Sequence, residues 1–397
     1  MSSRLGPTAP RDRIDDIDVL RGMALCGVLL SNLLDIFRMP WSRTYHVPNS
    51  VTIDVVVDEI MLVVFSGNTI TLTFAMLFGL GMAISSERMF ERGTSAYPFL
   101  VRKQIALLAL GLVHATLIWN GDILVSYAFL GLVVLPLLRR SPRTAVCAAL
   151  ALAIVDVLPI YPARLPFMSD DAESTARAVQ IYGHGTWMQV QAQRFHDLLL
   201  IWRDVALRYF AFTAVAFCLG IAIWRSGFFA HLERRTRILR GLALGGIPSL
   251  AFIFLASHGY IPRPHAAFIL ALRRLGYTAA FLALSFSYCA GILLLLRTTF
   301  WRPRLLLIAP LGRMALSNYI MQSILFGFVF YGYGLGQYGK WPSAITAVFG
   351  LFVYALQVAY SHLWLRYFKF GPFEWLWRTL SYGEMQPFRN DHAPAAR

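Results

Sequence analysis

A histidine and an aspartate flank a short turn within an otherwise apolar part of the chain. Asn120-Gly121-Asp122 is typical of a tight turn between two helices, and His114 lies six residues before it. A buried histidine beside a carboxylate could act as a general base, because its partner tunes its affinity for a proton. Two other interpretations stay open. His114 could be a structural hydrogen-bonding residue, and Asp122 could cap the free amides of the second helix.

The first long apolar stretch carries a second group of polar side chains. At 100° per residue, one arc of about 100° on a helix would contain Asp18, Arg21, Asn32 and Asp35. Each of these groups would cost several kcal/mol in lipid, so this face must contact protein or water. One interpretation is a polar seam that packs helices together. The other is the lining of a cavity, with Asn32 as a candidate catalytic residue.

A third group begins with Arg313, at the start of another apolar stretch. Asn318 and Gln322 are four residues apart and would share one helical face. Such amides often bond across helices as packing contacts. In the alternative interpretation, Arg313 and Arg21 flank a mouth that accepts an anion such as phosphate, with Asn318 as a further binding residue.

The elements that position these groups are long apolar stretches. The chain has 397 residues, of which 57% are hydrophobic and only 14% charged. A bilayer core about 30 Å thick needs roughly 20 apolar residues in each helix that crosses it. We therefore predict an all-α fold, a polytopic transmembrane helix bundle of about ten helices. The expected spans lie near Val19–Phe37, Ile60–Ile84, Gln104–Trp119, Ile123–Leu138, Ala145–Ile160, Val205–Trp224, Leu239–Ser257, Gly276–Leu296, Leu311–Tyr331 and Ala344–Trp364.

The basic residues predict the orientation of these spans. In this map, 25 of the 36 lysines and arginines fall on the side of the two termini, which leaves 11 on the opposite side. Positive loops face the cytoplasm, so we expect both termini to be cytoplasmic and the protein to lie in the cytoplasmic (inner) membrane. The net charge of +15 is therefore explained by topology and does not indicate nucleic acid.

The expected spans divide the chain into three parts. They are a cytoplasmic segment at 1–17, a transmembrane domain at 18–366 with outer loops near 38–59 and 161–204, and a tail at 367–397. The tail mixes aromatic and basic residues, which suits a helix in the membrane interface anchored by Trp375 and Trp377. No small-residue cleavage site follows the first stretch, so we expect an uncleaved first helix.

The cysteines give no sign of a metal or redox site. They are scattered within or beside the spans, and no CxxC or Cys/His spacing indicates zinc. We interpret them as small apolar residues in helix packing, and they are Cys26, Cys147, Cys218 and Cys289.

Several distinctive motifs are spread over nearly the whole chain. They are Leu20-Arg21-Gly22-Met-Ala-Leu, Leu77-Phe78-Gly79-Leu80-Gly81, the segment from His114 to Tyr127, Gly312-Arg313-Met-Ala-Leu-Ser-Asn318-Tyr, and the end from Phe370 to Gly383. In combination they resemble the motifs of the YeiB-like family of polytopic membrane proteins.

This resemblance implies a distant relation to transmembrane acyltransferases, which carry an acyl group from cytoplasmic acyl-CoA to a sugar on the far side. The inner-membrane O-acyltransferases have a histidine eleven residues after the arginine of the Leu-Arg-Gly motif, where this sequence has Asn32. Heparan-α-glucosaminide N-acetyltransferase uses a histidine in the following outer loop, and His46 is the histidine of that loop here.

We therefore expect an acyltransferase-like protein without a covalently bound cofactor and with acyl-CoA as co-substrate. Arg21 and Arg313 would hold the phosphates, and the acyl chain or pantetheine arm would reach along the Asn32 face. His46, or His114 near Asp122, would take the proton of a hydroxyl or amine on a glycan or lipid-linked acceptor.

Two other classes of function stay open, a small-molecule transporter and a non-catalytic membrane scaffold. The sequence shows no paired repeats of the kind that many transporters have. The bilayer is the expected partner in every case, and the sequence leaves homo-oligomerisation open.

Overall fold

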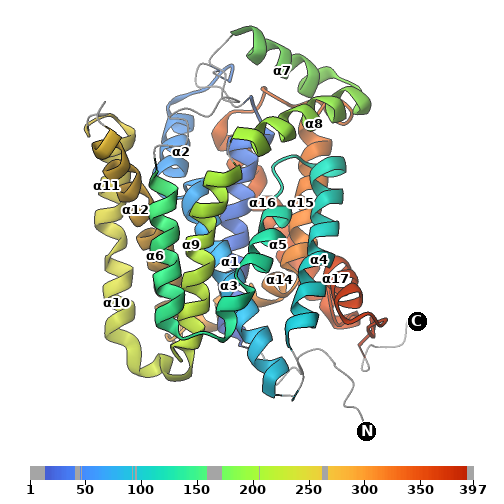
Figure 1. The fold of residues 1–397 in the computed structure, drawn as a ribbon. Helices are drawn as coiled ribbons and strands as arrows, with labels where there is room; N and C mark the ends of the chain where they lie inside the picture. Colours follow the sequence, from blue (N-terminus) through green and yellow to red (C-terminus); the bar gives the residue numbers. More distant parts are fainter. Residues whose placement is uncertain are drawn as a thin grey trace.

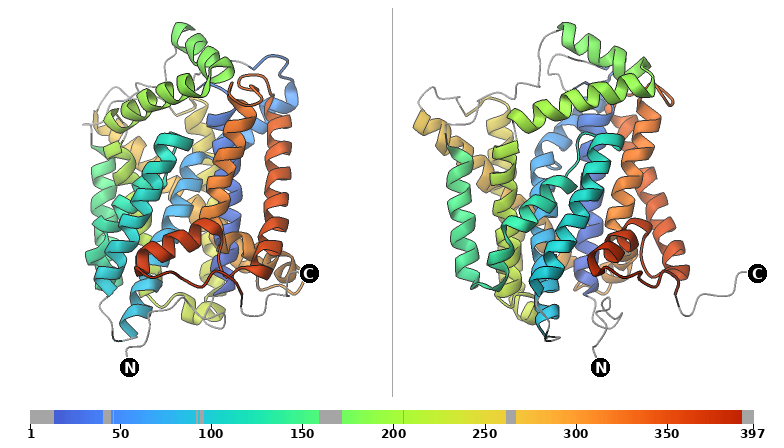
Figure 2. Two further views of the ribbon diagram at one scale, coloured as in Figure 1. Left: turned by 90° about the vertical axis from the view of Figure 1, so that its right-hand side faces the viewer. Right: turned by 45° about the vertical axis from the view of Figure 1, so that its right-hand side comes forward.

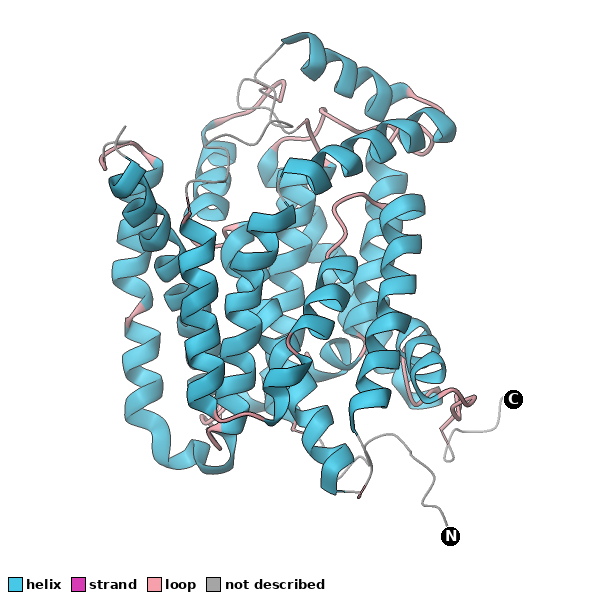
Figure 3. Cartoon of the chain, in the orientation of Figure 1, coloured by secondary structure: helices cyan, strands magenta, loops and turns pink. Residues whose placement is uncertain are grey.

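The computed structural model describes residues 14–40, 45, 47–91, 93, 96–158, 172–204, 206–261 and 267–390. Within these ranges the chain folds into helices that mostly run up and down one bundle (Figures 1 and 3). The described part contains one isolated β-bridge, between Phe368 and Arg389, and otherwise no β-strand. The expectation of an all-α membrane protein is confirmed at this level.

Seven helices among the described residues are long and apolar enough to cross a membrane. Two of them end in a π-helical turn, Leu33–Phe37 after α1 and His114–Ile118 after α4. The helices that form these seven candidate spans are α1 (Asp15–Asn32), α3 (Gly67–Glu91), α4 (Ala96–Val113), α9 (Ala206–Arg225), α10 (Thr236–Leu244) with α11 (Gly246–Ser257), α12 (Ala267–Leu295) and α16 (Ser343–Tyr367).

The expected number of about ten spans is not confirmed, because three helices of the bundle are too short to count by this measure. They are α5 (Leu124–Val133), α6 (Pro142–Val157) and α15 (Ala315–Phe330). The start of the expected span Ile60–Ile84 is wrong. The helix is broken at Ser66, between α2 (Thr52–Val63) and α3.

Shorter elements connect these helices. They are the 3₁₀ turns Leu135–Arg139 and Phe229–Arg235, α7 (Ala172–His184), α8 (Trp187–Asp204), α13 (Trp301–Leu306), α14 (Ala309–Arg313) and α17 (Pro372–Tyr382). α7 and α8 lie across one end of the bundle, whereas α17 lies against α4 at the other end, where α1 begins (Figures 1 and 2). We call these the α8 end and the α17 end.

Close backbone contact between α3 and α9 forms the centre of the bundle. A Cβ atom on Gly220 would lie 2.0 Å from the Met76 carbonyl oxygen, and one on Gly79 would lie 2.3 Å from that of Phe217. Only glycine allows this approach, and small residues at helix contacts are typical of membrane bundles. The Leu77-Phe78-Gly79 motif is therefore explained by packing.

Replacing Gly220 by alanine should destabilise the bundle, because the new methyl group would overlap the backbone of α3. Overpacking of this kind costs about 1–3 kcal/mol. Gly291 in α12 is a matched control, since its Cβ would meet no atom within 4 Å. We expect thermal unfolding in lipid nanodiscs to show a lower midpoint for Gly220→Ala than for Gly291→Ala, and equal midpoints would contradict the assignment.

Candidate functional site

A cavity of about 310 Å³ lies at the α17 end, between α1, α3, α4, α14, α15 and α17. Its lining changes in character along its length. The lining includes basic side chains from five helices, α17 among them, and apolar and aromatic side chains toward α5.

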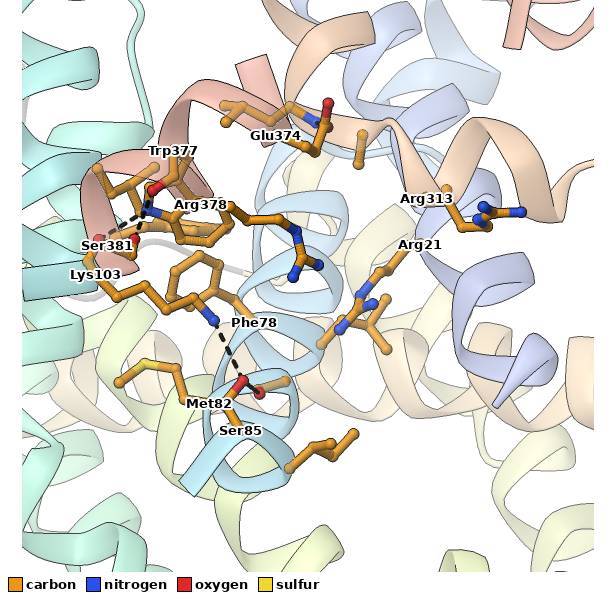
Figure 4. A pocket seen from close by; sticks show the side chains of 18 of the residues that line it. Arg21, Phe78, Met82, Ser85, Lys103, Arg313, Glu374, Trp377, Arg378 and Ser381 are labelled. Carbon is orange, nitrogen blue, oxygen red and sulfur yellow. Dashed lines mark hydrogen bonds between the residues drawn. The ribbon is translucent and has the colours of Figure 1, made fainter. Parts of the chain in front are cut away.

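Six lysines and arginines line the cavity, against two carboxylates, Asp18 and Glu374. Three of the six side chains, those of Arg21, Lys103 and Arg378, point into the same space, whereas the guanidinium of Arg313 points away from them (Figure 4). The cavity therefore favours an anion. The six are Arg21, Arg88, Lys103, Arg313, Lys369 and Arg378.

Neighbouring side chains hold two of these cations in place. The Arg21 Nη1 donates to Asp18 Oδ1 over 3.1 Å, and about a third of its side chain remains exposed (31%). The Lys103 Nζ donates to Ser85 Oγ over 3.2 Å and lies 4.9 Å from the centre of the Trp377 ring. These contacts hold the Arg21 guanidinium and the Lys103 amino group in fixed positions at the cavity.

A glycine contact brings α1 and α14 together beside the cavity. A Cβ on Gly312 would lie 1.9 Å from the Asp18 carbonyl oxygen, and one on Gly22 would lie 2.9 Å from that of Ile308. Each glycine neighbours an arginine of the cavity lining. The Arg21-Gly22 and Gly312-Arg313 pairs are therefore explained together, since the glycines allow the contact and the arginines line the cavity beside it.

α17 is attached to the bundle through a buried glutamate. The Glu374 Oε1 accepts hydrogen bonds from the amides of Leu316 (2.7 Å) and Ser317 (3.0 Å), and its Oε2 accepts from the Ser317 hydroxyl. The carboxyl group thus caps the N-terminus of α15. Burial raises the pKa of Glu374, and these hydrogen bonds act in the opposite direction.

The far end of the cavity is apolar and aromatic. Phe78, Leu107 and Leu124 line it, together with Tyr127 and Tyr319. Tyr319 is also a neighbour of the histidine singled out above, because its ring centre lies 5.1 Å from that of His114. The cavity therefore leads from the basic side chains to the surroundings of His114.

His114 and Asp122 form a buried pair. The His114 Nδ1 lies 2.7 Å from Asp122 Oδ2, and the two side chains are 1% and 2% exposed. The other carboxylate oxygen, Oδ1, accepts from the Val125 amide over 2.7 Å. Asp122 thus serves both as a cap and as the partner of His114. Among the described residues, His114 Nε2 has no hydrogen-bond partner.

A pair of this geometry could act chemically as a general base. A carboxylate oxygen accepts a hydrogen bond, so the contact with Asp122 fits the His114 tautomer with the hydrogen on Nδ1. The lone pair of Nε2 is then available to accept a proton from a substrate. His114 also begins a π-helical turn, a distortion that is frequent at functional sites.

Of the predicted site residues that the structure describes, Arg21 and Arg313 line the cavity. The His114–Asp122 pair is not part of the lining and adjoins it through Tyr319, and the two asparagines lie outside it as well. Asn32 is half-buried near the α8 end of α1, and Asn318 Nδ2 donates to Met314 O and Ser361 Oγ, each over 3.0 Å. Asn318 therefore forms a hydrogen bond across to α16, as expected if the amides on this face of α15 serve helix packing. His46 lies outside the described residues.

Sequence reasoning missed Lys103, Trp377 and Arg378 as cavity residues. The basic residues at the α17 end were interpreted as signals of membrane orientation, and Trp377 was interpreted as an anchor in the membrane interface. The available signal was the mixture of basic and aromatic residues in the tail. That mixture does not reveal that α17 folds back onto α4.

The fold and the cavity define a multi-pass helical membrane protein with a basic cavity at one end of its bundle. A family model described as "Protein of unknown function (DUF418)" matches residues 223–384. "Uncharacterized protein YxaH" of Bacillus subtilis is 33% identical and covers 97% of this chain and 98% of the relative. The chain therefore belongs to the DUF418 family, as the YeiB-like motifs predicted.

Two further relatives extend the family. "Uncharacterized protein YeiB" of Escherichia coli is 28% identical, over 92% of this chain and 95% of that protein. An "Uncharacterized 39.9 kDa protein in amylase 3'region" of Bacillus acidopullulyticus is 26% identical, over 96% of this chain and 98% of that protein. No solved structure matches the chain.

Replacing Glu374 by alanine should release α17 from α15, because the amides of Leu316 and Ser317 would lose their acceptor. Buried donors left without a partner cost about 1–3 kcal/mol. Limited proteolysis should then cleave α17 faster, whereas the exposed Glu384→Ala variant should resemble the parent. Equal cleavage rates in the two variants would show that Glu374 does not hold α17.

Proposed function

We propose that this protein is a membrane-embedded acyltransferase that takes an acyl group from acyl-CoA in the basic cavity. The acceptor would be a hydroxyl or amine near His114. One observation carries the proposal: a single cavity is lined by six lysine and arginine side chains and by Tyr319, which contacts the ring of His114.

The basic part of the cavity suits the phosphates of acyl-CoA. Coenzyme A carries a pyrophosphate and a 3′-phosphate on one end of a long flexible arm, and its acyl thioester on the other end. Arg21, Lys103 and Arg378 point into one space, and charge-assisted bonds from such groups to phosphate are strong. The apolar part beyond Phe78 and Leu107 would receive the arm and the acyl group.

The buried pair supplies the base. His114 Nε2 would take the proton of the acceptor O–H or N–H as its oxygen or nitrogen attacks the thioester carbonyl carbon. The new C–O or C–N bond forms and the C–S bond breaks. The proton then passes to the leaving thiolate, which gives free CoA and regenerates neutral His114. Asp122 stabilises the imidazolium that exists between these two steps.

We infer that the α17 end faces the cytoplasm and that the protein lies in the cytoplasmic membrane of a bacterium. In the map of ten expected spans, both termini fall on the side with 25 of the 36 lysines and arginines, and loops with this excess face the cytoplasm. Acyl-CoA is a cytoplasmic metabolite, so the basic cavity would open toward its donor. The acceptor would arrive from the opposite, α8 side.

Removing a cavity cation should weaken the binding of acyl-CoA. Lys103→Met and Arg21→Met each delete one charged donor, worth about 1.5–3 kcal/mol, so the Kd should rise about tenfold or more. Arg240→Met is the control, because Arg240 is exposed on α10 and does not line the cavity. Isothermal titration of the purified protein with acetyl-CoA measures the effect, and equal Kd values in all three variants would contradict the proposal.

The His114–Asp122 pair should be needed for turnover but not for binding of the donor. General-base catalysis contributes roughly 10²–10⁴-fold, so His114→Ala should lose about that factor in thioester cleavage. Asp122→Asn should also lose activity while it keeps its bond to the Val125 amide, because an amide nitrogen cannot accept the His114 proton.

Release of free CoA, measured with a thiol reagent, reports this step. The control is His231→Ala, since His231 is exposed and outside the cavity lining. Full activity of Asp122→Asn would show that Asp122 acts only as a helix cap and not as the partner of a catalytic His114. Uptake of an intact anion into proteoliposomes without thioester cleavage would instead assign the cavity to a transporter.

A further inference from the structure

α8 has one face of large apolar side chains that the protein does not cover. Trp187, Met188, Phe195, Leu199 and Trp202 are all between 42% and 68% exposed. At 100° per residue they fall within an arc of about 120° on the helix. α8 is not one of the candidate spans and lies across the α8 end of the bundle (Figure 2).

Side chains next to this apolar arc fix α8 to the bundle. Val190 is fully buried, and Arg194, which is 1% exposed, donates from Nη2 to the Tyr333 hydroxyl over 3.0 Å. The Arg194 guanidinium also lies 4.5 Å from the centre of the Tyr331 ring. These contacts determine how α8 is rotated about its axis, so its apolar face points outward as part of the fold.

The apolar face continues into the surface of the neighbouring spans. The ring of Trp202 lies 6.0 Å from that of Phe210 in α9, which in turn lies 5.1 Å from that of Phe129 in α5. Phe129 is 48% exposed on the side of the bundle. In a membrane protein this side is covered by lipid, so the same lipid would reach α8.

We propose that α8 is an interfacial helix whose apolar face lies in the bilayer leaflet at the α8 end. Amphipathic helices with tryptophan on the apolar face bind at this depth, where the ring is apolar and its N–H reaches water. The lipid surface is favoured over a protein partner because the face is continuous with the lipid-covered sides of α5 and α9. The proposal does not depend on the proposed acyl transfer.

The location of α8 also affects the neighbourhood of His114. The Gln191 Nε2 donates to the carbonyl oxygens of Thr116 (2.8 Å) and Leu117 (3.2 Å). Both carbonyls belong to the π-helical turn that His114 begins. The helix that we assign to the lipid interface therefore supports the backbone that carries the histidine.

Fluorescent labels on two cysteine variants test the location of α8. Leu199→Cys lies on the apolar face, and His196→Cys lies about 60° beyond the edge of that face on the helix, where the native side chain is 65% exposed. The four native cysteines are first replaced by serine or alanine, and the labelled protein is placed in phosphatidylcholine–phosphatidylglycerol nanodiscs. We expect nitroxide-labelled lipid to quench the label at position 199 and aqueous iodide to quench the label at 196.

Equal quenching of both labels by iodide, without quenching by the lipid, would overturn the proposal. So would a label at 199 that neither quencher reaches, since a protein partner or a second copy would then cover the face. Met188→Cys, at the most exposed position of this face, replaces the first variant if thermal unfolding shows that Leu199→Cys is not folded.

Discussion

The high cost of charge inside a membrane is the constraint on which the structure depends. Arg21 and Lys103 both belong to candidate spans, where an uncompensated charge would be expelled from lipid. The cavity at the α17 end removes this conflict, because several helices surround the charges and part of Arg21 remains exposed.

The same constraint separates the two kinds of chemistry along the cavity. The cations gather near α17, where several can interact with one polyanionic ligand. The buried pair lies beyond an aromatic region that contains Tyr319, and there the His114 Nδ1 is within hydrogen-bond distance of Asp122. An acyl-CoA molecule has the matching distribution of charge, with its phosphates far from its reactive thioester. This correspondence is the basis of the proposed function.

The sequence predicted well what depends on local spacing and on the apolar stretches. The helical class and the turn between His114 and Asp122 follow from such patterns. The sequence did not predict the features that depend on contacts between segments far apart in the chain. Nothing local shows that α17 returns to α4 and brings Arg378 to Lys103, or that the π-helical turns interrupt α1 and α4. Asn32 shares a helical face with Arg21, but it does not line the cavity that Arg21 lines.

The central claim is that one cavity binds acyl-CoA with its phosphates at α17 and its acyl group near His114. The most direct measurement is a cryo-electron microscopy structure of the protein in nanodiscs with a thioether analogue of acetyl-CoA, which cannot be cleaved. The account predicts density for the phosphates beside Arg21, Lys103 and Arg378, with the acyl end next to Tyr319 and His114. Density for the analogue elsewhere, or an empty cavity at a saturating concentration of the analogue, would contradict it.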